Sequence, residues 1–292
     1  MTNSEIHIAA LIVTYNRLEF LKEVINAIRN QTLQPSKILV VNNSSTDGTK
    51  EWLAGQNDLH VVEQANVGSS GGQYTLFKTA FEMGFEWLWT MDDDVIPRPD
   101  CLENLMKNSN ENIIRTPVRF TPAGVPYEND CIKFNLRNPF RSMWTRIANE
   151  TELLSGELPA EGITFEGPLM HRSVVEKIGF PEFGFFIFGD DSEYFIRAKK
   201  AGFKTIIISA AKMDRKLNVD DLEKKFTWKH YFIIRNIFAI DVLHASFCVR
   251  IIRPIIYYLK WLLRANSGED RKTVNRAFRD GYFYKRKYPP GN

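Results

Sequence analysis

The stretch Trp87-Leu-Trp-Thr-Met-Asp-Asp-Asp94 is an apolar run that leads directly into three consecutive carboxylates. Its large and aromatic residues favour a buried β-strand over Trp87–Met91. Three adjacent carboxylates repel one another when they are unpaired, and a divalent cation relieves that repulsion. Hard oxygen ligands suit Mg²⁺ or Mn²⁺, which usually complete their shells with substrate phosphates. A helix cap or a solvated acidic turn is the alternative interpretation of the triplet.

Upstream of this strand, β-rich apolar runs alternate with helical patterns. We predict strands at Ile8–Thr14, Ser36–Asn42 and Leu59–Gln64, and helices at Leu18–Asn30, Thr46–Gln56 and Gly71–Gly84. Strands that alternate with helices of this length indicate βαβ units and a mainly parallel sheet, so the predicted fold class is α/β. In such sheets ligands bind beyond the carboxyl ends of the strands. Four polar clusters fall at those ends: Tyr15-Asn16-Arg17, Asn42-Asn43-Ser44, Asn66–Gly72 and Asp92–Asp94.

The rest of the chain has weaker patterns. The part from about Arg115 to Glu166 is rich in Pro, Asn and Arg, and we expect strands with long loops that shape a substrate cleft. Beyond it we predict helices at Ser173–Ile178 and Ser192–Ala201 and a strand at Thr205–Ala210. From Trp228 to Leu263 the pattern is helical, aromatic and basic.

Two further segments carry residues suited to binding or catalysis. Asn66-Val-Gly-Ser-Ser-Gly-Gly72 leads into a helix, where glycines permit close backbone approach to a ligand and the helix N-terminus favours an anion. A plain loop is the alternative. Phe188-Gly-Asp-Asp-Ser-Glu193 is a second acidic cluster at a helix start. We expect one of Asp190 and Asp191 to cap the helix, which leaves the other free to take a proton from an acceptor hydroxyl.

Composition excludes several classes of protein. The chain has 292 residues, of which 44% are hydrophobic and 25% charged, and this argues against a disordered, fibrous or disulfide-scaffold protein. Cys101, Cys131 and Cys248 are widely spaced, so we expect reduced cysteines in a cytosolic protein. The N-terminus lacks a basic region before its short apolar run, so we expect no secretory signal.

The net charge of +3 is divided unevenly along the chain. Residues 1–211 carry 20 basic and 27 acidic side chains, whereas residues 212–292 carry 18 basic and 8 acidic ones. A basic tail on an acidic body favours a negatively charged partner surface for the tail, and a solvated helical surface is the alternative.

The order and spacing of five motifs resemble glycosyltransferase family 2, which has the GT-A fold. The motifs are Thr14–Arg17, Val41–Thr49, Asn66–Gly72, Asp92–Asp94 and Gly189–Glu193, and they cover roughly residues 6–215. The Gly-rich element, the triple Asp and the Asp-Asp-x-Glu element are most similar to the bacterial galactofuranosyltransferase and rhamnosyltransferase branch.

The resemblance implies a domain organisation. The fold would be that of a nucleotide-diphospho-sugar transferase, Rossmann-like, with a mixed, mainly parallel sheet flanked by helices. A GT-A catalytic domain would span 1–215, with a nucleotide-binding half at about 1–115 and an acceptor half at about 116–215. Residues 216–292 would form a basic, aromatic, helical C-terminal extension.

The resemblance also implies roles for individual residues. The UDP- or dTDP-sugar donor would contact Thr14, Tyr15, Asn16, Arg17, Asn42, Asn66, Gly71, Gly72, Asp92 and Asp93. Asn42 takes the place of a frequent Asp that pairs with uracil. Asp92 and Asp94 would hold Mn²⁺ or Mg²⁺ against the diphosphate, and Asp93 would face the sugar or ribose.

Catalytic and acceptor roles follow in the same way. Asp191 would be the base that deprotonates the acceptor hydroxyl, with Asp190 and Glu193 beside it. His171, Glu166 and Gly167 would contact the acceptor. Because this mechanism needs no covalent intermediate, the anomeric configuration would invert.

The sequence departs from the family at one point. The family often places a metal-binding His about two dozen residues after the base, but here that region reads Ala211-Lys-Met-Asp-Arg-Lys216. Asp214 could substitute as a ligand, or Arg215 and Lys216 could contact the diphosphate directly, which would weaken metal dependence.

The segment Trp228–Leu263 is strongly apolar but is interrupted by charges. A membrane-spanning helix needs about 20 largely uncharged residues. We therefore predict a basic amphipathic helix in the membrane interface, or a helical cap packed on the catalytic domain, and both can hold together. Tyr231 and the pair Arg235-Asn236 resemble a Tyr-x-x-x-Arg-Asn element of the same branch, near the diphosphate or the acceptor.

The leading hypothesis is an inverting, metal-dependent glycosyltransferase that builds a bacterial surface polysaccharide such as O-antigen. It would transfer galactofuranose from UDP-galactofuranose to a glycan or a polyprenyl-diphosphate-linked acceptor, in the cytoplasm and peripherally on the inner face of the plasma membrane. Transfer from dTDP-rhamnose is the first alternative.

Two other hypotheses are more distant. A nucleotidyltransferase would show a Gly-rich, Lys/Arg-bearing loop after the first strand, which Thr14–Arg17 lacks. The intact acidic clusters disfavour a non-catalytic membrane-associated scaffold. No recognition motif supports a nucleic-acid partner.

Overall fold

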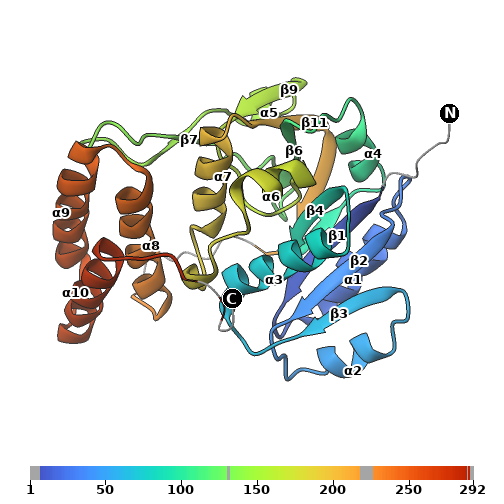
Figure 1. Ribbon diagram of the computed structural model, residues 1–292, viewed down its shortest axis with the longest axis horizontal. Coiled ribbons are helices and arrows are strands. Elements are labelled where there is room, and N and C mark those ends of the chain that lie inside the picture. Colours follow the sequence, from blue (N-terminus) through green and yellow to red (C-terminus); the bar gives the residue numbers. More distant parts are fainter. Residues whose placement is uncertain (1–6, 130–131, 218–225, 288, 290–292) are drawn as a thin grey trace.

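A nine-stranded sheet forms the centre of the molecule in the computed structural model, which describes residues 7–129, 132–217, 226–287 and 289 (Figure 1). The strand order is β3-β2-β1-β4-β10-β6-β11-β5, with β9 paired to β11. The first four strands are β1 (Ile8–Thr14), β2 (Lys37–Asn42), β3 (Leu59–Glu63) and β4 (Trp87–Asp92). Because these strands pair in parallel, their carboxyl ends meet at one edge of the sheet. The predicted α/β class is confirmed.

Helices cover both faces of this parallel half, which explains why every residue of β1 is buried. Successive side chains of a strand point to opposite faces, so β1 contributes to two hydrophobic cores. Ile12 shares one core with Leu21 of α1 (Leu18–Arg29). Leu11 shares the other with Phe77 of α3 (Gly68–Glu82).

Antiparallel strands extend the sheet on the other side of β4. The strand β10 (Leu169–His171) runs antiparallel between β4 and β6 (Ile113–Phe120). The strand β11 (Lys204–Arg215) pairs in parallel with β6 and antiparallel with β5 (Val95–Pro97) and β9 (Glu157–Ala160).

The end of β11 corrects one predicted boundary. We placed it at Ala210, but the strand continues past an irregularity between Ile208 and Lys212 and ends at Arg215. As a result the Lys216 N–H donates to the Asp94 carbonyl at 2.9 Å, and β11 ends at the same edge as the Asp triplet.

Shorter elements complete the body of the protein. They are α2 (Thr49–Ala54), α4 (Cys101–Met106), β7 (Ile132–Phe134), β8 (Trp144–Arg146), α5 (Glu150–Leu153), α6 (Arg172–Ile178), the 3₁₀ helix η1 (Phe183–Phe185) and α7 (Asp190–Lys200). The starts of α6 and α7 precede the predicted ones by one and two residues, and those of α2 and α3 differ by three. The helix α3 begins at Gly68, three residues before the expected Gly71. The helix α2 begins at Thr49 after Gly48, because Thr46 N–H bonds instead to the Asn16 side chain.

In the described residues after β11, three helices stand together beside α7, on the side away from the parallel strands (Figure 1). They are α8 (Lys229–His244), α9 (Phe247–Arg264) and α10 (Gly268–Tyr282). The single helical run predicted from Trp228 to Leu263 is therefore two helices, separated where Ser246 N–H donates to the Leu136 carbonyl. Within the described ranges, no helix is both long and apolar enough to cross a membrane.

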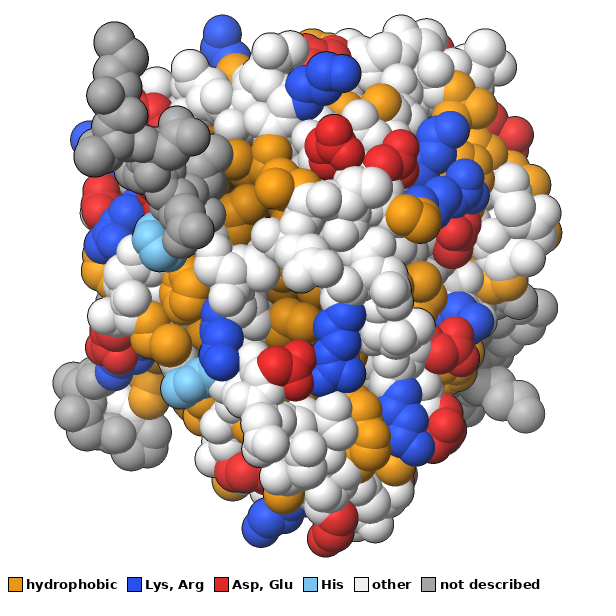
Figure 2. Space-filling model, turned by 90° about the vertical axis from the view of Figure 1, so that its right-hand side faces the viewer, with side chains coloured by type: hydrophobic (Ala, Val, Ile, Leu, Met, Phe, Trp, Pro, Cys, Tyr) orange, Lys and Arg blue, Asp and Glu red, His pale blue; other side chains and the backbone are white. Residues whose placement is uncertain are grey.

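The surface on the right-hand side of Figure 1 mixes charges of both signs. Lys and Arg alternate there with Asp and Glu around small hydrophobic patches (Figure 2). Cys101 is buried and Cys248 is exposed, and both are free thiols, while Cys131 lies outside the described residues.

Candidate functional site

The Asp triplet is bound to the loop that follows β1. Asp92 is the last residue of β4 and lies beside Val13 of β1 in parallel register. Thr14 Oγ1 therefore reaches Asp93 Oδ2 and donates to it at 2.7 Å. Arg17 Nη1 donates to Asp93 Oδ1 at 3.1 Å and to Asp94 Oδ2 at 2.7 Å. These bonds join the first and the last of the four clusters that the sequence placed at this edge, and Asn43 links the other two to them through the Thr14 and Gly68 carbonyls.

The triplet carries more negative charge than its protein partners balance. Burial raises the pKa of Asp92 well above its usual range, and the charges of Glu166, Asp94 and Asp93 raise it further. Burial also raises the pKa of Asp93 to about 6, although Arg17 opposes that rise. A site where one guanidinium faces several carboxylates is suited to an additional cation.

The donor atoms fit a hard divalent ion that is completed by a ligand. In the described part of the chain, no three His, Cys, Asp or Glu residues are arranged to hold a metal ion. Mg²⁺ is commonly held by one or two carboxylates together with substrate phosphates, so Asp92 and Asp94 would be a sufficient protein contribution if an ion binds here.

Asp214, the predicted additional ligand, has another partner. Both of its carboxylate oxygens accept hydrogen bonds from Arg98, at 3.0 and 2.8 Å. Metal binding by Asp214 would require this pair to open, and its role as a ligand stays a prediction. The alternative residues are paired as well, Arg215 with Glu166 and Lys216 with Glu23.

The expected nucleotide residues at the β1 and β2 ends hold each other in place. Asn16 has a left-handed backbone, with φ of 53°, and its N–H donates to Ser45 Oγ at 3.0 Å. Asn42 is fully buried and donates through Nδ2 to the Glu63 carboxylate at 3.0 Å. Tyr15 is exposed beside them.

Glu63 is a further residue at this edge that the sequence motifs did not indicate. It is exposed at the end of β3 and supplies a carboxylate next to Asn42, where the family often has an Asp. The signal was an acidic residue at the carboxyl end of a predicted strand.

The Gly-rich segment serves packing within the protein. A Cβ on Gly72 would lie 2.5 Å from a methyl group of Val13, and a Cβ on Gly68 would lie 2.0 Å from the Phe186 carbonyl oxygen. The Ser70 N–H donates to that same carbonyl at 3.1 Å. The expected open anion site at this helix start is therefore partly filled by the chain itself. Gly71 is buried, and Asn66 accepts a bond from the Gly68 N–H.

The second acidic cluster lies next to this helix start. The N-cap of α7 is Gly189, which makes no side-chain cap, so the expectation that an Asp would cap the helix is wrong. The φ of +83° at this position suits glycine, and the Asp191 carboxylate accepts the Ser192 N–H at 2.5 Å. Burial raises the pKa of Asp190 to about 6, and its neighbours include Ser70. Asp191 is half-buried.

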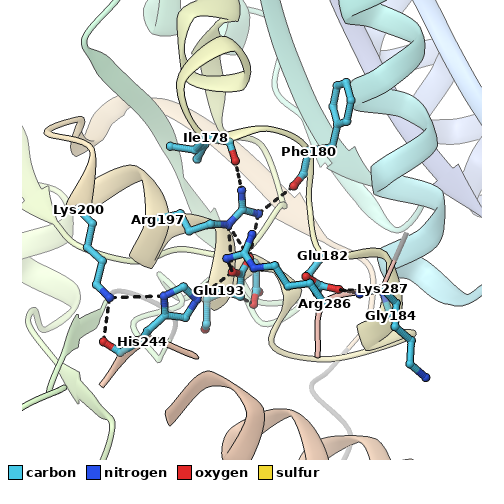
Figure 3. Close-up of polar contacts among 12 residues, drawn as sticks. Ile178, Phe180, Glu182, Gly184, Glu193, Arg197, Lys200, His244, Arg286 and Lys287 are labelled. Carbon is cyan, nitrogen blue, oxygen red and sulfur yellow. Dashed lines mark hydrogen bonds and ion pairs between the residues drawn. The ribbon is translucent and has the colours of Figure 1, made fainter. Parts of the chain in front are cut away.

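Glu193 lies in a buried ionic cluster (Figure 3). It is 0% exposed, and its carboxylate binds Arg197 at 2.8 Å, His244 Nε2 at 2.8 Å and Arg286 Nη2 at 2.8 Å. We predicted Glu193 beside the reacting groups. The structure instead places its side chain on the buried face of α7, where it contacts α8 and the chain after α10.

Of the three predicted acceptor residues, Glu166 and Gly167 lie together near the end of β4, and His171 is separated from them. Glu166 is buried near Asp92 and binds Arg119 and Arg215. Gly167 is buried, and its N–H donates a hydrogen bond to the Thr90 carbonyl. His171 is at the opposite end of the sheet, because β10 runs antiparallel to β4 and pairs His171 with Trp87. Its side chain caps α6, so the structure places it away from the Asp triplet, and its contact with the acceptor stays a prediction.

The Tyr-x-x-x-Arg-Asn element lies on α8. Tyr231 Oη donates to Asp280 of α10 at 2.8 Å. Arg235 and Asn236 are buried and bond to the backbone just before Asp190. The element therefore lies next to the loop that precedes Asp190-Asp191 and not in an open nucleotide pocket.

Known proteins resemble this chain in sequence and in fold. Residues 9–179, more than half of the chain, match the sequence profile described as Glycosyl transferase family 2. Galactofuranosyltransferase GlfT1 of Mycolicibacterium smegmatis is 26% identical over 211 residues, which are 69% of this chain and 68% of that protein. GlfT1 of Mycobacterium tuberculosis is 26% identical over 199 residues, 66% of this chain and 64% of that protein.

A solved structure shares the fold. The crystal structure of GalNAc-T7 with UDP, GalNAc and Mn²⁺ aligns with a TM-score of 0.66 at 11% identity, covering 96% of this chain and 56% of that one. The chain thus spans about two-thirds of the curated relatives and just over half of this solved chain.

Proposed function

This chain belongs to glycosyltransferase family 2 and has the GT-A fold, and on that premise we propose that it transfers galactofuranose from UDP-galactofuranose with inversion. The acceptor in this proposal is a hydroxyl group of a glycan or of a polyprenyl-diphosphate-linked glycan of a bacterial surface polysaccharide. The donor is supported by the galactofuranosyltransferases that are 26% identical. The observation that carries the proposal is the network of Arg17 with Asp93 and Asp94 at the ligand-binding edge of the sheet.

The donor diphosphate would bind between the Asp triplet and the loop after β1. Arg17 is 42% exposed, so its guanidinium can contact phosphate oxygens while it remains bound to Asp94. A divalent cation held by Asp92 and Asp94, Mn²⁺ or Mg²⁺, would offset the charge of the leaving nucleoside diphosphate. Asp93, fixed by Thr14 and Arg17, would contact the sugar or ribose.

The acceptor hydroxyl would lose its proton to Asp191. Asp191 is half-buried at the first turn of α7, whereas Asp190 is buried beside Ser70 of α3. The first turn of α3 also packs on Val13, next to Thr14 and its bond to Asp93. This shared contact supports a single site in which one carboxylate activates the acceptor from the side opposite the leaving group.

Calorimetry with UDP and Mn²⁺ tests the donor site. We expect binding by the wild type, weakening on omission of Mn²⁺, and weakening of at least about 10-fold in Arg17→Ala, since a charge-assisted bond to phosphate is worth about 1.5–3 kcal/mol. Arg29→Ala is the matched control, because Arg29 pairs with Asp58 away from this edge and should bind UDP as the wild type does. Failure to bind any nucleoside diphosphate would contradict the proposal.

We also propose that the outer face of α9 lies on an anionic membrane surface. Five apolar side chains at four-residue spacing are exposed there: Phe247 (77%), Ile251 (39%), Ile255 (49%), Leu259 (54%) and Leu263 (87%). Residues four apart share one helix face, and an exposed apolar patch of this kind marks an interaction site. Residues 226–287 carry 13 basic and 4 acidic side chains, a net charge of +9 that favours anionic lipid.

Flotation with vesicles of phosphatidylcholine and phosphatidylglycerol tests this surface. The double variant Ile255→Glu and Leu259→Glu should lose most of its recovery in the lipid fraction. The control Ala54→Glu and Asn57→Glu adds the same charge at exposed positions of the body and should float as the wild type does. Equal recovery of both variants would refute the membrane role of α9.

A further inference from the structure

The loop before the acidic pair Asp190-Asp191 has an unusual backbone. Phe186, Phe188 and Gly189 have φ of 65°, 66° and 83°, so three of four successive residues are left-handed. Residues other than glycine rarely adopt this conformation, and it persists only where the surroundings impose it. We propose that Arg235 and Asn236 of α8 impose it, and that they are positioning residues for the base. This inference rests on the proposed role of the acidic pair.

Asn236 contacts the loop through its amide nitrogen. Nδ2 lies 3.1 Å from the Phe185 carbonyl oxygen, 2.9 Å from that of Ile187 and 2.6 Å from that of Phe188. These carbonyls flank the left-handed residues Phe186 and Phe188, so the contacts with one amide group fix the path of the loop. Gly189 faces the Asn236 side chain, since a Cβ there would lie 3.6 Å from Asn236 Cβ.

Arg235 fixes the orientation of that amide. Its Nε donates to Asn236 Oδ1 at 2.8 Å, which directs the Asn236 nitrogen toward the loop. Its Nη2 donates to the carbonyl oxygens of Gly184 and Phe185, at 2.8 and 2.7 Å. Both residues are buried, so water does not compete for these bonds.

The chain after α10 bonds to the residues on both sides of this loop, Glu182 and Glu193 (Figure 3). Glu182, just before the loop, accepts bonds from Tyr284 Oη at 2.9 Å and from the Lys287 N–H at 3.0 Å. Glu193, just after it, binds Arg286. Gly281 permits the close approach of α10, because a Cβ there would lie 2.3 Å from the Arg235 carbonyl oxygen. The C-terminal segment therefore holds the loop at both of its ends.

The loop also contacts the start of α3, on the proposed donor side of the site. The Phe186 carbonyl accepts the Ser70 N–H at the start of α3, and Asp190 lies beside Ser70. The C-terminal helices therefore have a second role beyond the proposed contact with lipid. They set the position of the acidic pair relative to the donor.

The variant Asn236→Asp tests the inference, because it keeps the shape of the side chain and turns a carboxylate oxygen toward three carbonyls. We expect kcat to fall about 100-fold, as for a small displacement of a reacting group, while the Kd for UDP with Mn²⁺ stays within about twofold. Dividing kcat by the calorimetric UDP stoichiometry removes any loss due to unfolded protein. The control Asn275→Asp on α10 keeps an acceptor for Tyr258 Oη and should transfer as the wild type does.

Arg235→Lys decides the question if Asn236→Asp does not fold, since it keeps the charge and removes the second donor. A reduced kcat per UDP site in Arg235→Lys, with unchanged Kd for UDP, supports the inference. Wild-type kcat per site in the folded Asn236 and Arg235 variants would overturn it and leave the proposed function intact. Absence of transfer by the wild type with every donor would instead overturn the proposed function.

Discussion

Replacing Glu193 by Gln should destabilise the protein by an amount that depends on pH. Glu193 has no exposed surface, and three side chains bind its carboxylate: Arg197 and Arg286, each at 2.8 Å, and His244 at 2.8 Å. A neutral amide of the same size cannot pair with two guanidinium groups. It leaves cationic groups without their counter-charge in a buried place, which is strongly destabilising.

The pKa of Glu193 gives the magnitude. Burial alone would raise this pKa, but hydrogen bonds from His244 and Arg197 and the charge of Arg197 outweigh it and lower the pKa from 4.5 to about 2. This difference corresponds to about 3 kcal/mol of stability for the charged form. Because the pKa is lower in the folded state, the contribution is fully present above pH 4.5 and is lost as the pH falls toward 2.

Urea unfolding of the wild type and Glu193→Gln, followed by circular dichroism across this pH range, measures the difference. We expect the wild type to be more stable by about 3 kcal/mol at neutral pH, and the gap to narrow steadily below pH 4.5. Glu269→Gln is the control, because Glu269 pairs with Lys272 at the surface and its replacement should leave the free energy of unfolding close to that of the wild type. A gap that is absent at neutral pH, or that does not narrow in acid, would refute this account of Glu193.

Three other predictions follow from the site. Asp191→Asn should lower kcat by at least about 100-fold with little change in UDP affinity, as initial rates and calorimetry would show, and near wild-type turnover would mean that another group is the base. Gly68→Ala should lower the free energy of unfolding by about 1–3 kcal/mol, because its φ is +79° and the Phe186 carbonyl fills the space of a Cβ; an unchanged urea midpoint would contradict this. Chelation with EDTA should abolish transfer, and Mn²⁺ or Mg²⁺ should restore it, whereas full activity in EDTA would favour direct neutralisation of the diphosphate by Arg215 and Lys216.

Much of the parallel half of the fold could be predicted from the sequence. Each of its strands is a short apolar run that ends in a polar cluster, and the prediction of Ile8–Thr14 coincides with β1. Parallel neighbours place their carboxyl ends together by geometry, so the closeness of Arg17 to Asp93 and Asp94 could be expected before any distance was known.

The errors come from contacts that local pattern does not encode. Glu193 meets Arg286, which lies 93 residues along the chain, and spacing within a motif gives no sign of such a partner. His171 was misplaced because the direction of a three-residue strand cannot be read from its sequence, and that direction decides which edge of the sheet it faces. Gly72 suits close approach to a ligand and to Val13 equally well, so only the packing distinguishes the two.

Transfer from UDP-galactofuranose, with the product's anomeric configuration determined by NMR, tests the central claim most directly. The account predicts a galactofuranosyl product of inverted configuration, formed only with a divalent cation and lost in Asp191→Asn. A product of retained configuration, or no product from any UDP- or dTDP-sugar in the same assay, would contradict it.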